Sequence, residues 1–238
     1  MPSRAMKRVK KAMKKEAAPR QACTLEGGLW IAWCDHLLRE SSTWLYVLTI
    51  LCHMFCLRVT EGLRLKASDF SWETRSVRVG SLKRAPEVHK KITSAYLPLL
   101  RRLRKEGKGR RRSKPWGALG KRNFTDKWEW PNGEEYLFPN RTGTSYTKKA
   151  NVRKSFKPPA GCSLGDDVRQ VRSHSARHRK INDMKASSAS PEEGMTFARI
   201  KRKKTYDRYG KISQHQAGEA LQRNKKLQKA LKSLYAKA

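Results

Sequence analysis

Residues 173–183, SHSARHRKIND, carry two histidines and an arginine at a spacing that suits chemistry on a phosphate. His174 lies three residues before Arg177 and four before His178, so a helix would place all three side chains on one face. Two histidines four residues apart can bind zinc, but no glutamate lies between these two, and an arginine inside the site would repel the metal. An arginine can instead bind two phosphate oxygens at once, while a histidine donates or relays a proton. The segment therefore predicts a phosphate site without a metal ion.

The charge of the chain indicates the kind of molecule that carries this phosphate. The 238 residues include 55 Lys and Arg against 20 Asp and Glu, a formal net charge of +35. Such an excess repels itself in a compact fold, so a polyanionic partner is expected. Nucleic acid is the first candidate and an anionic membrane surface the second.

The most apolar stretch predicts a buried helix. Residues 44–57, WLYVLTILCHMFCL, are too few to cross a bilayer and include a histidine, so no membrane span is expected. The chain has five cysteines and begins without an apolar signal sequence. Both features indicate a reduced, intracellular protein, nuclear in a eukaryote and otherwise in the cytoplasm or nucleoid. Cys52 and Cys56 are interpreted as buried core cysteines, because no further zinc ligands follow at a matching spacing.

The remaining chain predicts a mainly helical domain with a small antiparallel sheet. Residues 58–65 are expected to continue the apolar helix through a more polar stretch of sequence. Val77 and Val79 alternate with a charged residue, and residues 91–97 also favour a strand. Helices are expected over residues 30–38, 43–57, 99–104, 145–156 and 168–184.

Three further segments are expected around this domain. Residues 1–23 predict a basic, disordered tail, either a nucleic-acid arm or nuclear signal or a plain tail. Residues 106–135 predict a basic insertion whose tryptophans either stack on bases or, as we favour, dock on the core. Residues 216–238 predict a last helix that packs on its own domain or on a neighbouring protomer. Its apolar stripe consists of Ala220, Leu227, Leu231 and Leu234.

Five segments in a fixed order resemble a known family. They read CLRVTEGLRLKASDF, SVRVGSLK, YLFPNRTGTSY, HSARH and KTYDRYGK. Together they resemble the catalytic domain of the tyrosine recombinases, the phage-integrase family, over residues 24–215. Each motif alone is weak in so basic a chain, but the order and spacing of five are specific. The resemblance implies an α+β, mainly helical fold with a small antiparallel sheet.

The first half of the resemblance carries two of the expected site residues. The family's first box has an arginine, an acid three residues later, then a leucine and an aspartate, which match Arg58, Glu61, Leu65 and Asp69. The lysine of the family's β-hairpin corresponds to Lys83. Glu61 is expected to steady an arginine rather than to touch the substrate.

The second half carries the other site residues and one departure. The second box, His-x-x-Arg, corresponds to His174 and Arg177, and the nucleophilic tyrosine corresponds to Tyr209, with Tyr206 as its rival. Nine positions before its tyrosine the family has His or Trp, but this chain has Ile200. Isoleucine fills space but cannot donate a hydrogen bond, so the sequence is compatible with both an active and an inactive enzyme.

The resemblance implies a reaction for each of these residues. Tyr209 attacks a DNA phosphodiester and forms a 3′-phosphotyrosine. Arg58 and Arg177 bind the phosphoryl oxygens, Lys83 protonates the departing 5′ oxygen, and His174 moves a proton at the nucleophile. No metal or cofactor is implied, and the phosphotyrosine retains the bond energy needed to rejoin strands.

The resemblance also implies double-stranded DNA as the partner, with a homo-oligomer forming on that DNA. Only about 40 residues precede the first box helix, so the family's N-terminal DNA-binding domain is expected to be absent or on another chain. Basic residues around the third box are expected DNA contacts: Arg199, Lys201, Arg202, Lys203 and Lys204.

Three other interpretations stay open. The chain is either an active recombinase or a catalytically inactive DNA-binding remnant of a mobile-element recombinase, an interpretation that Ile200 supports. A basic RNA-associated protein with accidental motif matches is a second alternative. A type IB topoisomerase shares the chemistry and is a third.

Overall fold

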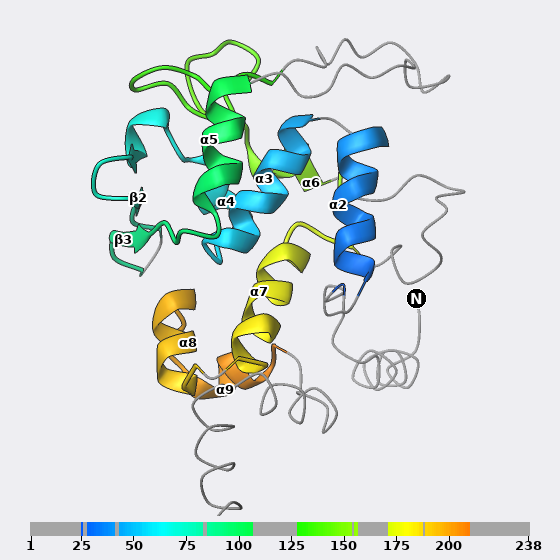
Figure 1. Cartoon of the computed structure of the whole chain (residues 1–238), viewed down its shortest axis with the longest axis vertical. Coiled ribbons are helices and arrows are strands. Elements are labelled where there is room, and N and C mark those ends of the chain that lie inside the picture. The colour runs from blue at the N-terminus through cyan, green and yellow to red at the C-terminus, as the bar shows by residue number, and fades with distance from the viewer. Residues whose placement is uncertain are drawn as a thin grey trace, which may run out of the picture.

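The computed structural model describes most of the central chain (Figure 1). The described residues are 25, 28–40, 43–82, 85–106, 128–153, 155–156, 171–187 and 189–209. The expected tail 1–23 and last helix 216–238 lie outside them, as do Lys83 and most of the insertion.

The apolar helix α3 (Thr43–Met54) forms the centre of the fold, and the amphipathic helix α2 (Leu29–Glu40) packs against it. Most side chains of α3 are buried, as its composition predicts. The expectation that this helix continues through residue 57 and into 58–65 is wrong. The chain turns at Cys56, whose φ is +51°, and the amide of Leu57 donates to the carbonyl of Cys52 at 2.9 Å, which closes the helix end. A separate short helix, α4 (Val59–Leu63), then begins after Arg58.

A three-stranded antiparallel sheet follows α4, in the order β1-β2-β3. After a 3₁₀ turn, η1 (Ala67–Asp69), the strands are β1 (Phe70–Ser71), β2 (Ser76–Val79) and β3 (Val88–Lys91). The small sheet is confirmed, but the expected strand over residues 91–97 is wrong. β3 begins before the predicted strand. The prediction missed it because Lys90, a charged residue, occupies an inward position opposite Val77. The basic helix α5 (Leu97–Glu106) begins where that strand was expected, with Pro98 in its first turn.

Among its described residues, the second half of the chain adds four helices. They are α6 (Lys149–Arg153), α7 (Ser175–Lys185), α8 (Pro191–Ala198) and α9 (Lys203–Asp207). The helices expected over 145–156 and 168–184 are thus shorter than predicted where they are described. Ser190 starts α8, since its hydroxyl accepts the Glu193 amide at 3.1 Å and its own amide donates to the Glu193 carboxylate at 2.7 Å. In Figure 1, α7, α8 and α9 gather at one end of the molecule, and α7 contacts α3.

The buried apolar side chains form two clusters. The larger lies around α3 and includes Trp128, whose indole N–H donates to the carbonyl of Leu137 at 2.8 Å. The expected docking of insertion tryptophans on the core is therefore confirmed for Trp128. The smaller cluster lies between α7, α8 and α9 and consists of Cys56, Ile181, Ala198, Ile200 and Tyr206. In the part of the chain that the structure describes, no helix is long and apolar enough to cross a membrane.

Candidate active site

Arg58 lies at the start of α4 and is held by the same helix. The Glu61 carboxylate accepts the Arg58 amide at 2.6 Å through Oε2 and the Arg58 Nη1 at 2.8 Å through Oε1. Glu61 is buried, whereas the Arg58 side chain is 34% exposed. The carboxylate therefore fixes one edge of the guanidinium and leaves the rest open to a ligand. This is the arrangement that a steadying role for Glu61 requires.

Arg177 lies in the first turn of α7 and is only 1% exposed. Its Nη1 donates to the carbonyl of Cys56 and its Nη2 to the carbonyl of Ala198. Burial acts to lower the pKa of Arg177, but ionisable Cys56 and Tyr209 beside it, together with a side-chain hydrogen bond to Tyr209, raise the pKa overall. Arg177 thus joins the turn after α3 to the end of α8 through one charged group.

His174 is the N-cap residue of α7, without a side-chain capping bond, and is surrounded by cations. Its Nε2 lies 3.3 Å from the Nζ of Lys149, at the start of α6. Burial and the charges of Lys149, His178, Arg177 and Arg58 lower the pKa of His174 to about 4. The imidazole is therefore neutral at pH 7, and the lysine donates to Nε2.

His178 follows one turn later and is also neutral. Burial and the nearby Arg177 lower its pKa to about 4. Its ring lies against the Tyr209 ring, with 4.5 Å between centroids at an angle of 58°. Among the described residues, no group of three or more His, Cys, Asp or Glu side chains could hold a metal ion.

The two candidate nucleophiles have different surroundings. Tyr206 is 3% exposed and packs in the smaller cluster, where a side chain on Gly194 would collide with its hydroxyl. Tyr209 is half-buried at the end of the described chain, lies against the His178 ring and contributes to the raised pKa of Arg177. A nucleophile needs an accessible oxygen beside the groups that bind the phosphate. The geometry therefore favours Tyr209.

Ile200, at the position of the departure, is an apolar packing residue. It is 7% exposed and lies in the smaller cluster with Tyr206. The basic residues around it differ from one another. Arg199 turns inward, with a side chain that is 5% exposed, and does not face outward as the expectation of a DNA contact requires. The other four expected DNA contacts are exposed: Lys201, Arg202, Lys203 and Lys204.

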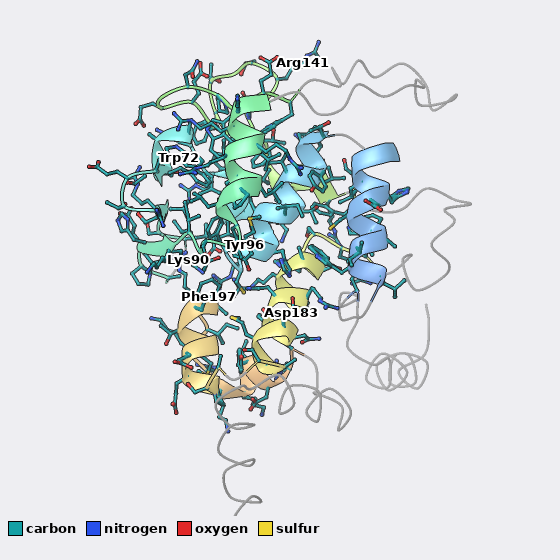
Figure 2. The ribbon with its side chains drawn as sticks, in the orientation of Figure 1. Trp72, Lys90, Tyr96, Arg141, Asp183 and Phe197 are labelled. Carbon is teal, nitrogen blue, oxygen red and sulfur yellow. The ribbon has the colours of Figure 1, made fainter. Side chains whose placement is uncertain are left out.

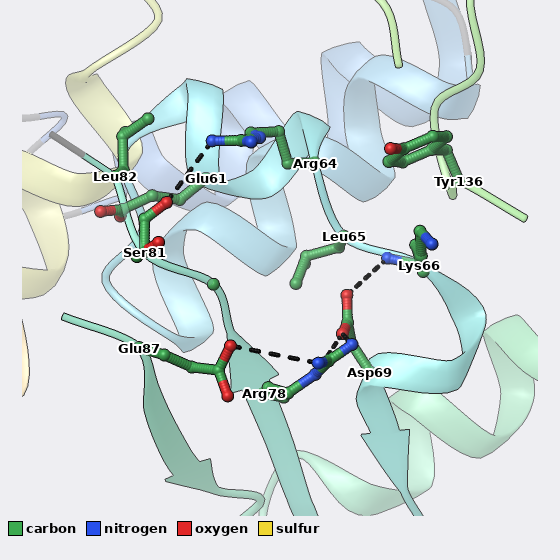
Figure 3. Close-up of a pocket in the computed structure, with 11 residues that line it drawn as sticks. Glu61, Arg64, Leu65, Lys66, Asp69, Arg78, Ser81, Leu82, Glu87 and Tyr136 are labelled. Carbon is green, nitrogen blue, oxygen red and sulfur yellow. Dashed lines mark hydrogen bonds and ion pairs between the residues drawn. The ribbon is translucent and has the colours of Figure 1, made fainter. Parts of the chain in front are cut away.

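The β2–β3 hairpin borders the site beside α4. Lys83 lies outside the described residues, but Leu82 and Ala85 on either side of its segment exchange two backbone hydrogen bonds, at 3.1 and 3.0 Å. A cavity of about 250 Å³ lies between this hairpin and α4 (Figure 3). Figure 3 shows Arg78 between Asp69 and Glu87, with an Arg78–Asp69 distance of 2.8 Å. Because its carboxylates are paired with arginines, the cavity is not a cation site.

Several contacts at the site have no signal in the sequence. Lys149 is one lysine among many, and Lys90 reads as an ordinary strand residue. Yet Lys90 is buried, and its Nζ donates to the carbonyls of Phe55, at 2.7 Å, and Phe197. Burial lowers the pKa of Lys90 to about 8. Figure 2 shows Lys90 and Phe197 together, and the lysine lies 4.3 Å from the ring centroid.

Comparison with known proteins places this arrangement in a class. The fold is that of a tyrosine-recombinase catalytic domain. It matches a Tn1549 transposon integrase in complex with circular intermediate DNA with a TM-score of 0.52 and 13% identity, covering 88% of this chain and 66% of that one. It matches the XerH site-specific recombinase bound to a palindromic difH substrate with a TM-score of 0.50 and 16% identity, covering 86% and 54%. The chain thus spans two thirds or less of the length of these two proteins.

The sequence identifies the family. Residues 31–209 match the phage integrase family, and the chain belongs to it. No curated protein matches the sequence. The resemblance and the fold class inferred from the five motifs are confirmed.

Proposed function

We propose that this chain cleaves and rejoins DNA strands through a 3′-phosphotyrosine formed by Tyr209, in site-specific recombination or DNA integration. Membership of the phage integrase family supports the reaction class. The observation that carries the assignment is the position of Tyr209, whose ring lies 4.5 Å from the ring of His178 on the helix that carries Arg177. Tyr209 is also one of the groups that raise the pKa of the buried Arg177, a cation suited to bind the phosphate that the tyrosine oxygen attacks.

The proposed step exchanges one phosphate ester for another. The Tyr209 oxygen forms a bond to phosphorus while the bond from phosphorus to the 5′ oxygen breaks. The phenolic proton passes to a base, and the candidate is the neutral His174, whose pKa of about 4 makes it a weak base in the protein without DNA. Lys83 supplies a proton to the departing 5′ oxygen. Attack of a 5′ hydroxyl on the phosphotyrosine reverses both changes and rejoins a strand.

The charges around the site suit this reaction. Arg58 presents an open guanidinium edge, Arg177 meets the nucleophile, and Lys149 adds a third cation next to His174. Negative charge spreads over the phosphoryl oxygens in the transition state, and fixed cations stabilise it without reorganising. The net charge of +35 favours DNA as the carrier of the phosphate, and we propose that several copies of the chain assemble on it.

A DNA substrate with a nick beside the scissile phosphate tests the proposal. Loss of the short fragment past the nick prevents rejoining, so the covalent adduct accumulates and its tyrosine can be mapped by mass spectrometry. We expect Tyr209→Phe to abolish the adduct with little change in DNA affinity, because it removes one hydroxyl and no charge. Tyr206→Phe is the matched control and should keep the adduct. An adduct that survives Tyr209→Phe and is lost with Tyr206→Phe would move the nucleophile.

A second candidate function is a DNA-binding remnant without catalysis. Ile200 supports it, because the residue is packed among apolar side chains and offers no donor to a phosphate. If the protein is a slow enzyme, Ile200→His should raise the cleavage rate by up to ~10²–10³, the effect of one well-placed donor. Thermal melting checks that the variant folds. No adduct from either the wild type or a well-folded Ile200→His would favour the remnant.

A further inference from the structure

Arg199 has an unusual backbone and an unusual side chain. It ends α8 in the left-handed conformation, with φ +55° and ψ +47°, which glycine adopts without strain and arginine does not. Its side chain is long and charged, yet it turns inward and is largely buried. A non-glycine residue kept in a strained conformation indicates that its side chain contributes something that glycine cannot.

The Arg199 guanidinium connects three parts of the site. Its Nη1 lies 3.3 Å from the Glu61 Oε1, the oxygen that also accepts Arg58. Its Nη2 donates to the carbonyl of Pro86 and lies 3.5 Å from the carbonyl of Gly80. Gly80 follows β2 and Pro86 precedes β3, so these contacts lie at both ends of the loop that joins the two strands.

We infer that Arg199 is a positioning residue, which ties the end of α8 to the two ends of the β2–β3 loop and to the carboxylate that holds Arg58. The inference rests on the proposed function for its effect on catalysis. It differs from the role expected from the sequence, in which Arg199 contacts DNA directly. A planar guanidinium can reach a carboxylate and a carbonyl at the same time, which a lysine ammonium on a single stem cannot do with the same geometry.

The test compares two arginines with the same backbone conformation. Arg199→Gly removes the side chain and relieves the left-handed strain, and this relief offsets part of the stability lost with the contacts to Glu61 and Pro86, so the variant should still fold. Arg75 is exposed in the turn between β1 and β2 and has φ +51°. Arg75→Gly therefore removes the same charge and relieves the same strain away from the site.

Two measurements follow on these variants. In single-turnover cleavage of the nicked DNA at saturating DNA, Arg199→Gly should be slower by roughly 10²-fold, because about 1 Å of misplacement has that effect. Arg75→Gly should cleave like the wild type. Hydrogen exchange at the Leu82 and Ala85 amides, which pair across the hairpin segment, should become about tenfold or more faster in Arg199→Gly alone.

The outcomes separate this inference from the proposed function. The positioning role would be overturned if Arg199→Gly cleaved at the rate of Arg75→Gly. It would also be overturned if the cleavage rate of Arg199→Gly reached the wild-type rate at saturating DNA. Arg199→Lys should not restore the rate, and a restored rate would show that charge alone suffices. If the wild type forms no adduct, the proposed function fails, and exchange still decides the matter. Faster exchange only in Arg199→Gly would support the tie to the hairpin, and unchanged exchange would overturn it.

Discussion

The two arginines that face the proposed phosphate lie in different regions of the molecule. Arg58 sits at the open edge of α4 and has one carboxylate partner and a partly exposed guanidinium. Arg177 sits at the buried junction between the two halves of the chain and bonds two backbone carbonyls. One arginine is free to bind a ligand, whereas the other also holds the fold together. Two residues with one chemical role should therefore fail in different ways when they are removed.

The largest effect is expected at the junction. Arg177→Ala leaves the Cys56 and Ala198 carbonyls without their donor and should lower the free energy of unfolding by about 2–5 kcal/mol, besides abolishing the adduct. Denaturant unfolding measures the loss. Arg179→Ala, on the same helix but partly exposed, is the control. Equal destabilisation by both variants would contradict the special place of Arg177.

At the open edge, chemistry should be lost with little loss of stability. Arg58→Ala should slow single-turnover cleavage by ~10²–10³, the effect of one transition-state donor, while stability changes by about 1 kcal/mol. Glu61 keeps its contact with Arg199 in this variant. Arg64→Ala removes a nearby exposed arginine and serves as control. Unfolding of Arg58→Ala as extensive as that of Arg177→Ala would remove the distinction between the two regions.

The junction should also respond to pH through Lys90. Its pKa in the folded protein, about 8, is below the ordinary 10.5, because burial disfavours the charge. Between these values the unfolded chain binds a proton that the folded chain has lost, so this contribution to stability is complete above pH 10.5 and is lost as the pH falls through 8. The difference in unfolding free energy between wild type and Lys90→Met should therefore change by roughly 3 kcal/mol over this range. A constant difference would contradict the buried charge.

The smallest effect is expected at His174. Lys149→Met removes one of the charges that lower the pKa of His174, so this pKa should rise above about 4. The imidazole signals in an NMR titration measure the shift, and Lys148→Met is the control next along the chain. If the pKa of His174 moved equally in both variants, the net positive charge of the region, and not the contact with Lys149, would be its cause.

The sequence predicted the family and the fold class better than the bounds of the elements. The motifs selected Arg58, His174, Arg177 and Tyr209 because their types and order are set by the chemistry, and the catalytic roles of these four residues stay predictions. The prediction failed at Cys56, where the helix was expected to continue. The chain turns there instead, and the carbonyl of Cys56 accepts a hydrogen bond from the distant Arg177. Contacts between residues so far apart leave no trace in local periodicity.

Two further errors have the same origin. Lys90 obscured the strand pattern, because a buried lysine looks like an exposed one until its carbonyl partners are known. Arg199 was grouped with the exposed basic residues that follow it, since charge alone does not reveal direction. In such a basic chain, local composition cannot separate the cations that bind DNA from those that bind backbone.

The bond from Arg177 to the Cys56 carbonyl also sets an order of events during synthesis. The two residues are 121 positions apart. At about 5–20 residues per second, the ribosome adds Arg177 roughly 6–24 s after Cys56. Until then the turn that precedes Arg58 lacks the donor that it has in the finished protein. Under the proposed mechanism, a nascent chain that has not yet reached Arg177 and Tyr209 cannot cut DNA.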